Sequence, residues 1–355
     1  MSNILSLLNG YCNNVTAKTL KDLSLIIGSP IGITKLNRRT NIMEQCKHLE
    51  QLRLKRLHQG TLVINSIDTG ISNFAISKFK WDLMSPWPTL LSWEKIQLER
   101  KFLPELEIES SSLEPNDFSL MTYRLVEYLL DEKDNVSKPD LFTIERQRTR
   151  TMSSRFVLDP IIRCNILENV LYSTLENRIR YNNMGKHEYS VLSSNPQRMT
   201  SFWCPTDNDK NKKKNSNKYS KDFKIKLVKE IIRNSCMDNA NDLGRPFIGI
   251  PQDWKIDLVK LLNSSASAKF KLFNCLRNHE NDTSNISGVK KDDDLADSFL
   301  HGLSWMEWLR NYIEIYNLLS RDTMQVSNKE NATQFVEYCT MKREKMETLQ
   351  SKIAA

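Results

Sequence analysis

The chain has 355 residues, 39% of them hydrophobic, which is enough to bury the core of one large domain or of one domain with a small module. Its seven cysteines are scattered without a Cys-x-x-Cys pair, which argues against a structural zinc site or a disulfide framework and favours a reducing compartment. No apolar run approaches the roughly 18 residues that cross a membrane, and the formal net charge of +8 favours a polyanionic partner.

The first 60 residues are polar, with leucines repeated at helical spacing. Leu20, Leu23 and Ile27 fall on one face of a predicted helix that ends at Gly28-Ser29-Pro30. A second helix is predicted from about Asn37 to Leu57, with a basic face that either contacts a partner or is simply solvated. Its basic residues are Arg38, Arg39, Lys47, Arg53, Lys55 and Arg56. The absence of acidic residues from the first twenty positions is weakly typical of an organelle transit peptide.

From Thr61 onward the hydrophobic period changes to that of β-strands. Three successive runs predict an antiparallel meander: "TLVINSIDTG", "NFAISKFKW" and "TLLSWEKIQL". Later elements are an amphipathic helix around Met121–Leu129, a buried strand in "PDLFTIERQ", a long helix from Asp159 to about Arg180, a strand in "EYSVLSSNP", a lysine-rich loop near residues 207–222, a basic helix near Phe223–Cys236 and a closing helix from about Asp293 to Leu319. This order predicts an α/β protein with a ribonuclease H-like fold, in which helices flank a mixed five-stranded sheet.

Acidic residues stand at the ends of several predicted elements. Asp68 ends the first strand, Glu145 ends a later one, and Asp292–Asp294 with Asp297 open the closing helix. Residues three or four apart share a helix face, so the sequence leaves open which of two neighbouring aspartates, 293 or 294, joins Asp297. Capping and the helix dipole also favour acids in a first turn, but this does not account for Asp297 in the apolar part of the helix.

The tripeptide Asp68-Thr69-Gly70 occurs in aspartic proteases and in ribonuclease H-like nucleases, and an Asp-x-Gly turn occurs in actin-like and sugar kinases. A protease needs two such loops and this chain has one. A kinase needs further glycine-rich phosphate loops, whereas this chain has only ten glycines. A metal-dependent nuclease accounts for the acids and the positive charge together.

Several carboxylates at one place repel each other unless cations join them. Oxygen donors without His or Cys suit Mg²⁺ or Mn²⁺, and two ions about 4 Å apart are typical of phosphodiester cleavage. We therefore expect two divalent ions on the catalytic and metal-binding set Asp68, Glu145, Asp293, Asp294 and Asp297, one to activate a water and one to stabilise the leaving 3′ oxygen. No small-molecule cofactor is expected.

Basic residues follow the second acid, in the order Arg146, Arg148, Arg150 and Arg155. The guanidinium fork matches phosphate oxygens, so these arginines are predicted to contact DNA, although they could also form a solvated loop. The segment "NPQRMTSFW" adds Arg198, with Phe202 and Trp203 available either for base stacking or for the core.

Four segments together resemble the fungal mitochondrial Holliday junction resolvases, the cruciform-cutting endonucleases of budding yeasts, which are related to RuvC within the ribonuclease H-like superfamily. They are "SIDTGISNFAISK", "LFTIERQRTRTMSSR", "SSNPQRMTSFW" and "GVKKDDDLADSFLHGLSWMEWL". The resemblance covers nearly the whole chain. It implies a mitochondrial, Mg²⁺-dependent homodimer that binds four-way DNA junctions and cuts two opposed strands symmetrically. It assigns the catalytic acids to Asp68, Glu145, Asp297 and either Asp293 or Asp294.

The N-terminal segment "VTAKTLKDLSLIIGSPIGITKLNRRTNIMEQC" resembles a SAP-like helix–turn–helix module that binds DNA, and an ordinary helical hairpin is the alternative. DNA contacts are expected there from Lys35, Arg38 and Arg39. The expected division is a SAP-like module with a basic linker helix over residues 1–58, the catalytic domain with its lysine-rich loop over 59–325, and a helical tail over 326–355.

Two other functions share parts of this pattern. A nuclease for RNA–DNA hybrids would have the same acids and would cut hybrid duplexes. A DNA-binding protein without activity would bind junctions equally well after Asp68→Asn, and the intact acid set argues against it.

Overall fold

The computed structural model describes residues 3–105, 113–130, 138–147, 159–181, 189–205, 216–237, 245–263, 270–276, 291–325 and 328–354. It contains one five-stranded sheet with the order β3-β2-β1-β4-β5. The strands are β1 (Thr61–Asp68), β2 (Phe74–Asp82), β3 (Thr89–Ile96), β4 (Leu141–Glu145) and β5 (Ser190–Ser194). The first three pair antiparallel, and β4 and β5 extend the sheet in parallel on the other side of β1. This mixed arrangement confirms the predicted ribonuclease H-like fold.

The central strand β1 is buried on both faces, as expected for a strand with neighbours on each side and helices above and below. Its alternate side chains enter two separate cores. Leu62 and Ile64 belong to one core, and Ile67 belongs to the other. The run "LVI" is therefore continuously apolar because both sides of the strand are covered.

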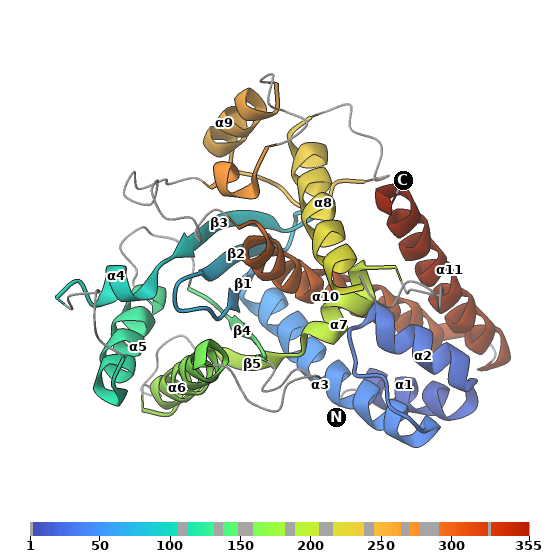
Figure 1. The fold of residues 1–355 in the computed structure, drawn as a ribbon. Helices are drawn as coiled ribbons and strands as arrows, with labels where there is room; N and C mark the ends of the chain where they lie inside the picture. Colours follow the sequence, from blue (N-terminus) through green and yellow to red (C-terminus); the bar gives the residue numbers. More distant parts are fainter. Residues whose placement is uncertain are drawn as a thin grey trace.

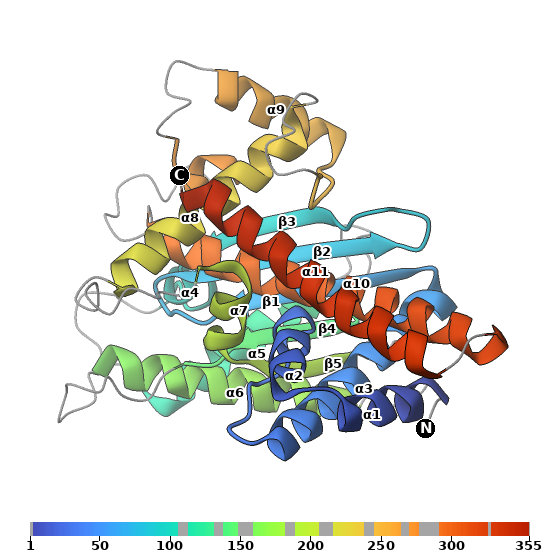
Figure 2. The same ribbon diagram turned by 90° about the vertical axis from the view of Figure 1, so that its right-hand side faces the viewer.

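Helices cover the two faces of the sheet (Figures 1 and 2). One face carries α3 (Lys35–Gln59) and α10 (Asp293–Gln325), with α8 (Ser216–Cys236) packed on α10. The opposite face carries α4 (Leu98–Phe102), α5 (Pro115–Leu130) and α6 (Asp159–Tyr181), which enclose the second core.

Helix α10 lies very close to the sheet because of one glycine. A Cβ atom on Gly302 would lie 2.6 Å from the Phe79 ring and 3.0 Å from Cβ of Ser66, so a larger side chain would push the helix away. Phe299, almost one turn earlier, packs edge-on against Phe79 at 5.4 Å between ring centroids. This close packing fixes the rotation of α10, and therefore which of its side chains point toward the ends of the strands.

The N-terminal part of the chain forms helices, as predicted. They are α1 (Asn3–Asn14), α2 (Ala17–Ile26) and α3, and α2 ends before Gly28-Ser29-Pro30. Gly28 has a φ of +68° and lies directly against the Trp308 ring, where a Cβ would clash. Leu20 and Leu23 belong to the same core cluster as Trp308. The N-terminal helices thus share the core of the sheet's α10 face, and a SAP-like module is not confirmed.

The remaining elements are α7 (Pro196–Trp203), α9 (Gln252–Asn263), the 3-10 helix η4 (Leu272–Cys275) and α11 (Asn328–Ala354). The C-terminal helix α11 crosses α10 and contacts α2 and α8, so the expected tail at 326–355 is one packed helix (Figure 2). Within the described part of the chain, none of the helices combines the length and apolarity required to cross a bilayer.

Candidate active site

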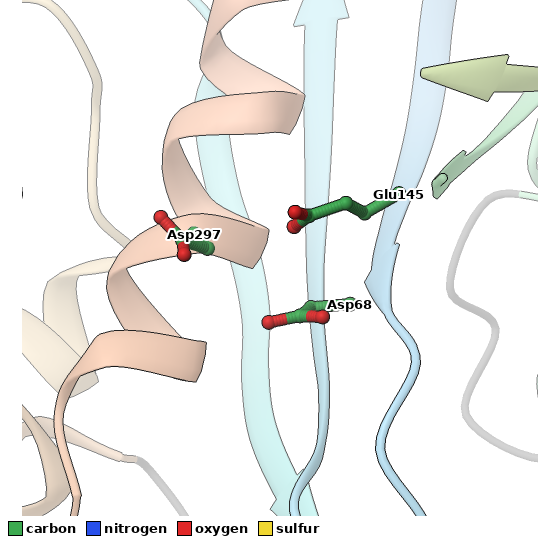
Figure 3. A group of neighbouring side chains, drawn as sticks. All are labelled: Asp68, Glu145 and Asp297. Carbon is green, nitrogen blue, oxygen red and sulfur yellow. The ribbon is translucent and has the colours of Figure 1, made fainter. Parts of the chain in front are cut away.

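Three acidic side chains from distant parts of the chain meet at one edge of the sheet (Figure 3). Asp68 is the last residue of β1 and Glu145 is the last residue of β4. These strands are parallel neighbours, so their carboxyl ends lie together. Asp297, in the second turn of α10, faces both of them. One carboxylate oxygen from each residue lies within 4.8 Å of the other two, which defines the acidic triad Asp68–Glu145–Asp297.

The acidic triad is electrostatically strained without a cation. Burial raises the pKa of Asp68 well above its usual value, and the nearby charges of Glu145 and Asp297 raise it further. Burial also raises the pKa of Asp297 to about 6, although Lys224 acts in the opposite direction. Three oxygen donors with this mutual repulsion form a site that a hard divalent cation would stabilise.

Each aspartate at the start of α10 is paired with its own lysine. The pairs are Asp293 with Lys221, Asp294 with Lys95, and Asp297 with Lys224; the first two have N–O distances of 2.8 Å. Lys95 lies on β3, whereas Lys221 and Lys224 lie on α8. Burial acts to lower the pKa of Lys224, but the charge and hydrogen bonding of Asp297 raise it overall, so its ammonium group stays protonated. These lysines partly neutralise the acids.

The structure separates the two aspartates that the sequence could not distinguish. Asp294 and Asp68 line the same cleft, which has a volume of about 530 Å³, and the negative charge of Asp294 contributes to the raised pKa of Asp68. Asp293 faces Lys221, whose hydrogen bond lowers the pKa of Asp293 although burial acts to raise it. The geometry therefore favours the three-residue spacing Asp294–Asp297 over the four-residue spacing Asp293–Asp297.

Two polar side chains behind the acidic triad were not predicted from the sequence. The Gln147 amide donates to Oδ1 of Asp68 at 3.4 Å. His301 lies 3.2 Å from Glu145, measured between Nε2 and Oε2. The four-residue interval from Asp297 to His301 is a signal that could have identified the histidine, whereas the contact of Gln147 depends on how β1 and β4 pair.

A further arginine lies in the cleft itself. Arg163, in the first turns of α6, forms an ion pair with Asp159 at 2.6 Å, and both line the cleft together with Asp68 and the turn that follows it. Side chains from both covering layers, α6 and α10, therefore line the cleft that reaches Asp68. A guanidinium at this place suits a phosphodiester.

The arginines predicted after the second acid are only partly covered by the structure. Arg146 is exposed, and its backbone N–H donates to the carbonyl of Ser194 at 2.9 Å, which continues the β4–β5 pairing. Arg148, Arg150 and Arg155 lie outside the described residues, and so do residues 206–215 of the lysine-rich loop.

Arg198, which was expected to contact DNA, makes several contacts within the protein. Its guanidinium donates to the carbonyl of Gly28 and, at 2.7 Å, to the side chain of Gln45. It also lies 5.0 Å from the centroid of the Trp308 ring. Burial lowers the pKa of Arg198 to about 10. Arg198 therefore fastens the N-terminal helices to α10, and these contacts favour a structural role over the expected contact with DNA.

The neighbouring aromatic side chains belong to the core. Phe202 and Trp203 are almost fully buried, and the Trp203 indole N–H donates to Ser304 at 2.8 Å. Of the two alternatives that the sequence left for these residues, core packing is correct and base stacking is not.

The N-terminal basic residues hold local structure together. Lys35 and Arg38 donate to the backbone carbonyls of Asn13 and Gly32 at 3.0 and 2.8 Å. Arg39 donates to the Asn9 side chain at 3.0 Å. Lys35 is exposed and the two arginines are half-buried, so their contact with DNA stays a prediction.

The sheet order and the acids at the ends of β1 and β4 define a protein of the ribonuclease H-like class. The chain belongs to the family described as mitochondrial resolvase Ydc2 / RNA splicing MRS1, whose model matches residues 64–315. Its expected place among the fungal mitochondrial resolvases is thereby confirmed, and the family is mitochondrial by name.

Individual relatives extend over most of the chain. It is 44% identical over 358 residues to the mitochondrial cruciform cutting endonuclease 1 of Saccharomyces cerevisiae, covering 98% of this chain and 96% of the relative. It is 24% identical over 328 residues to the mitochondrial RNA-splicing protein MRS1 of the same yeast, covering 88% and 85%. The crystal structure of the yeast mitochondrial Holliday junction resolvase Ydc2 superposes with a TM-score of 0.52 at 19% identity, covering 86% of this chain and 99% of that one, which supports the fold.

Proposed function

We propose that this protein is a structure-selective endodeoxyribonuclease that resolves four-way DNA junctions in mitochondrial DNA recombination and segregation. One observation carries the proposal. The acidic triad Asp68–Glu145–Asp297 is assembled at the edge of the sheet in a chain that is 44% identical, over 98% of its length, to a mitochondrial cruciform cutting endonuclease. The expected reaction is hydrolysis of a phosphodiester, giving a 5′-phosphate and a 3′-hydroxyl.

The donor set fits divalent ions such as Mg²⁺ or Mn²⁺. Asp68, Glu145 and Asp297 offer only oxygen atoms, and the pKa values of Asp68 and Asp297 are raised first by burial and then by the negative charge of the neighbouring acids. Asp294, which lines the same cleft as Asp68, is the fourth candidate ligand and supplies a further negative charge for a second ion. Divalent ions at such a site supply activation of a water and stabilisation of charge on the phosphate oxygens.

The chain's own basic residues would position the substrate. Arg163 lines the cleft and Arg146 is exposed beside it, so both are placed to bind phosphates that flank the cut. Lys224 holds Asp297 in the structure and brings a protonated amine to the acidic triad. Arg148, Arg150 and Arg155 are proposed to continue the same phosphate contacts. Such contacts give affinity and salt dependence without reading sequence.

A homodimer is part of the proposal because one acidic triad cuts one strand. A two-fold axis would place the second triad on the opposed strand with the same geometry, which accounts for paired symmetric cuts. Residues 1–58, with Lys35, Arg38 and Arg39, are proposed to add DNA contacts beside the catalytic domain at 59–325, and the helical tail at 326–355 completes the division of the chain.

The test uses purified protein and a labelled four-way junction, with Mg²⁺ or with a chelator. Linear duplex and an RNA–DNA hybrid serve as competing substrates, and Asp68→Asn is the matched inactive control. We expect paired symmetric nicks in the junction alone, dependent on Mg²⁺ and absent with Asp68→Asn. If the protein cuts the hybrid in preference to the junction, the proposed substrate is wrong. If it binds the junction but does not cut it in Mg²⁺ or Mn²⁺, the protein is a DNA-binding protein and not a nuclease.

A further inference from the structure

A buried histidine stands directly behind the acidic triad. His301 is 1% exposed and lies on α10, about one turn after Asp297. Its Nε2 atom lies 3.2 Å from Oε2 of Glu145, and its Nδ1 atom lies 3.0 Å from the hydroxyl oxygen of Ser194. Ser194 is fully buried and ends β5, directly opposite Glu145 in the β4–β5 pairing. The histidine therefore bridges two strand ends.

The chemistry of the partners assigns which ring nitrogen carries the hydrogen. An ionised carboxylate has no hydrogen to give, so Nε2 of His301, which faces Glu145 at 3.2 Å, carries the ring hydrogen; this contact is electrostatic and is not aligned as a hydrogen bond. In a neutral ring Nδ1 then has no hydrogen and accepts from the Ser194 hydroxyl at 3.0 Å. The hydrogen bond with Ser194 and the contact with Glu145 together fix the tautomer and the plane of the imidazole.

We infer that His301 is a positioning residue that holds the Glu145 carboxylate in the orientation in which it joins the acidic triad. Glutamate has three side-chain torsions, and a metal ligand with this freedom must be ordered before it can bind an ion. Asp68 and Asp297 have one torsion fewer, so they are more nearly fixed by their strand and helix. The imidazole takes over this ordering for Glu145 because it is itself fixed by Ser194 and by burial.

The inference also explains why α10 carries a polar residue at a fully buried position. Leu300 and Leu303 beside it are apolar and fully buried. The buried Ser298 and Ser304 donate to carbonyls of α10 itself, whereas His301 contacts two strand ends. A histidine that only filled space could be replaced by leucine without consequence for the metal site. A histidine that orients Glu145 could not be replaced in this way, because its Nε2 atom lies 3.2 Å from the carboxylate and leucine offers no polar atom there.

The inference rests on one part of the proposed function, namely that the acids bind a divalent ion. Its main measurement needs no DNA. Mn²⁺ binding to the full chain is measured by the electron paramagnetic resonance signal of free Mn²⁺ for the wild type, His301→Leu and His301→Gln. The leucine variant lacks the N–H donor, whereas the glutamine amide can replace it. His58→Gln, at an exposed position near the end of α3, is the control.

We expect His301→Leu to raise the Kd for Mn²⁺ about 10-fold to 100-fold, the range typical for outer partners of metal ligands. His301→Gln should recover most of that loss, and His58→Gln should bind Mn²⁺ as the wild type does. Junction binding in a chelator should be the same for all four proteins, because no metal takes part. An unchanged Kd in a folded His301→Leu protein, or a glutamine variant no better than leucine, would overturn the inference.

A second variant covers the case in which His301→Leu does not fold. Ser194→Ala removes the hydroxyl that fixes Nδ1 while leaving the imidazole in place, and it should weaken Mn²⁺ binding in the same direction but by less. An unchanged Kd in Ser194→Ala together with a misfolded His301→Leu would also overturn the inference. If Mn²⁺ binding depends on His301 as expected but the wild-type protein cuts no junction, the proposed function alone would be overturned.

Discussion

Replacement of Asp68 by asparagine should make the metal-free protein more stable while abolishing its metal-dependent activity. Asparagine has the same shape as aspartate and still offers an oxygen to the Gln147 amide, which donates to Asp68 at 3.4 Å. The change therefore removes one negative charge from the acidic triad with little change in packing. The result is a gain in the free energy of unfolding, since the remaining acids, Glu145 and Asp297, lose a repelling neighbour.

The magnitude follows from the spacing of the acidic triad. Two like charges 4.8 Å apart repel by about 3.5 kcal/mol at an effective dielectric constant of about 20. Protonation already relieves part of this, because burial and the neighbouring acids raise the pKa of Asp68 well above its usual value, and Lys224 offsets another part. We expect a net gain of roughly 1–3 kcal/mol at pH 7.5, which corresponds to a rise in Tm of roughly 1–4 °C for a chain of this length.

The gain should depend on pH in a defined direction. A carboxyl group whose pKa is raised on folding favours the folded state below its unfolded pKa, and this contribution is lost as pH rises through the folded pKa. For Asp297 the window runs from about 4 to about 6. The wild type without metal should therefore lose stability as pH rises through this window and further through the raised pKa of Asp68, and the advantage of Asp68→Asn should be small at pH 4.5 and larger at pH 7.5.

The assay is thermal and urea unfolding of both proteins in a chelator at the two pH values, followed by the same scans with Mg²⁺. Mg²⁺ should raise the Tm of the wild type and leave Asp68→Asn nearly unchanged, because the ion binds only the intact site. Asp257→Asn, at an exposed carboxylate on α9, is the control and should change stability by less than about 0.5 kcal/mol. A loss of stability in Asp68→Asn at pH 7.5, or a gain that persists at pH 4.5, would refute the electrostatic reasoning.

Four other predictions follow from the same geometry. Lys224→Gln should lower the Kd for Mn²⁺ measured without DNA, because the lysine competes with the ion for Asp297; a higher Kd would contradict this. Asp294→Asn should slow Mg²⁺-dependent junction cutting by roughly 100-fold, whereas Asp293→Asn should slow it by only a few-fold. The two variants are compared by their single-turnover cutting rates. Equal losses of rate would mean that the three-residue spacing is wrong. Cutting rates should fall as pH drops below about 6, where Asp297 is protonated and binds metal poorly, and a flat profile down to pH 5 would argue against this. Arg198→Ala should cost about 1–3 kcal/mol in urea unfolding and leave the salt dependence of junction binding unchanged, whereas a slope reduced by about one would show a phosphate contact.

The elements and the acids could be predicted because they depend on local pattern. The apolar, β-rich run "TLVINSIDTG" and the alternation in "NFAISKFKW" predicted the meander, because both patterns depend only on residues that are close together in the chain. Asp68 and Glu145 were recognised because each ends a strand, and parallel neighbours bring such ends together. The family resemblance was carried by the same segments, which is why it indicated the correct fold.

The sequence could not predict contacts that depend on how distant elements pack together. The choice between Asp293 and Asp294 is made by the rotation of α10, which Gly302 and Phe299 fix against β1 and β2. Arg198 looks like a surface cation in the sequence, and only the packing of α7 between α2 and α10 shows that its donors are already used.

The lysines and the histidine around the acidic triad show the same limit. Lys224 on α8 contacts Asp297, and His301 on α10 contacts Glu145. In both pairs the two residues are more than 70 positions apart in the chain. A sequence specifies periodicity over a few residues, so it fixes the elements and the acids that end them. The partners that tune those acids are selected by the tertiary structure, because burial and opposite charge act through space and not along the chain.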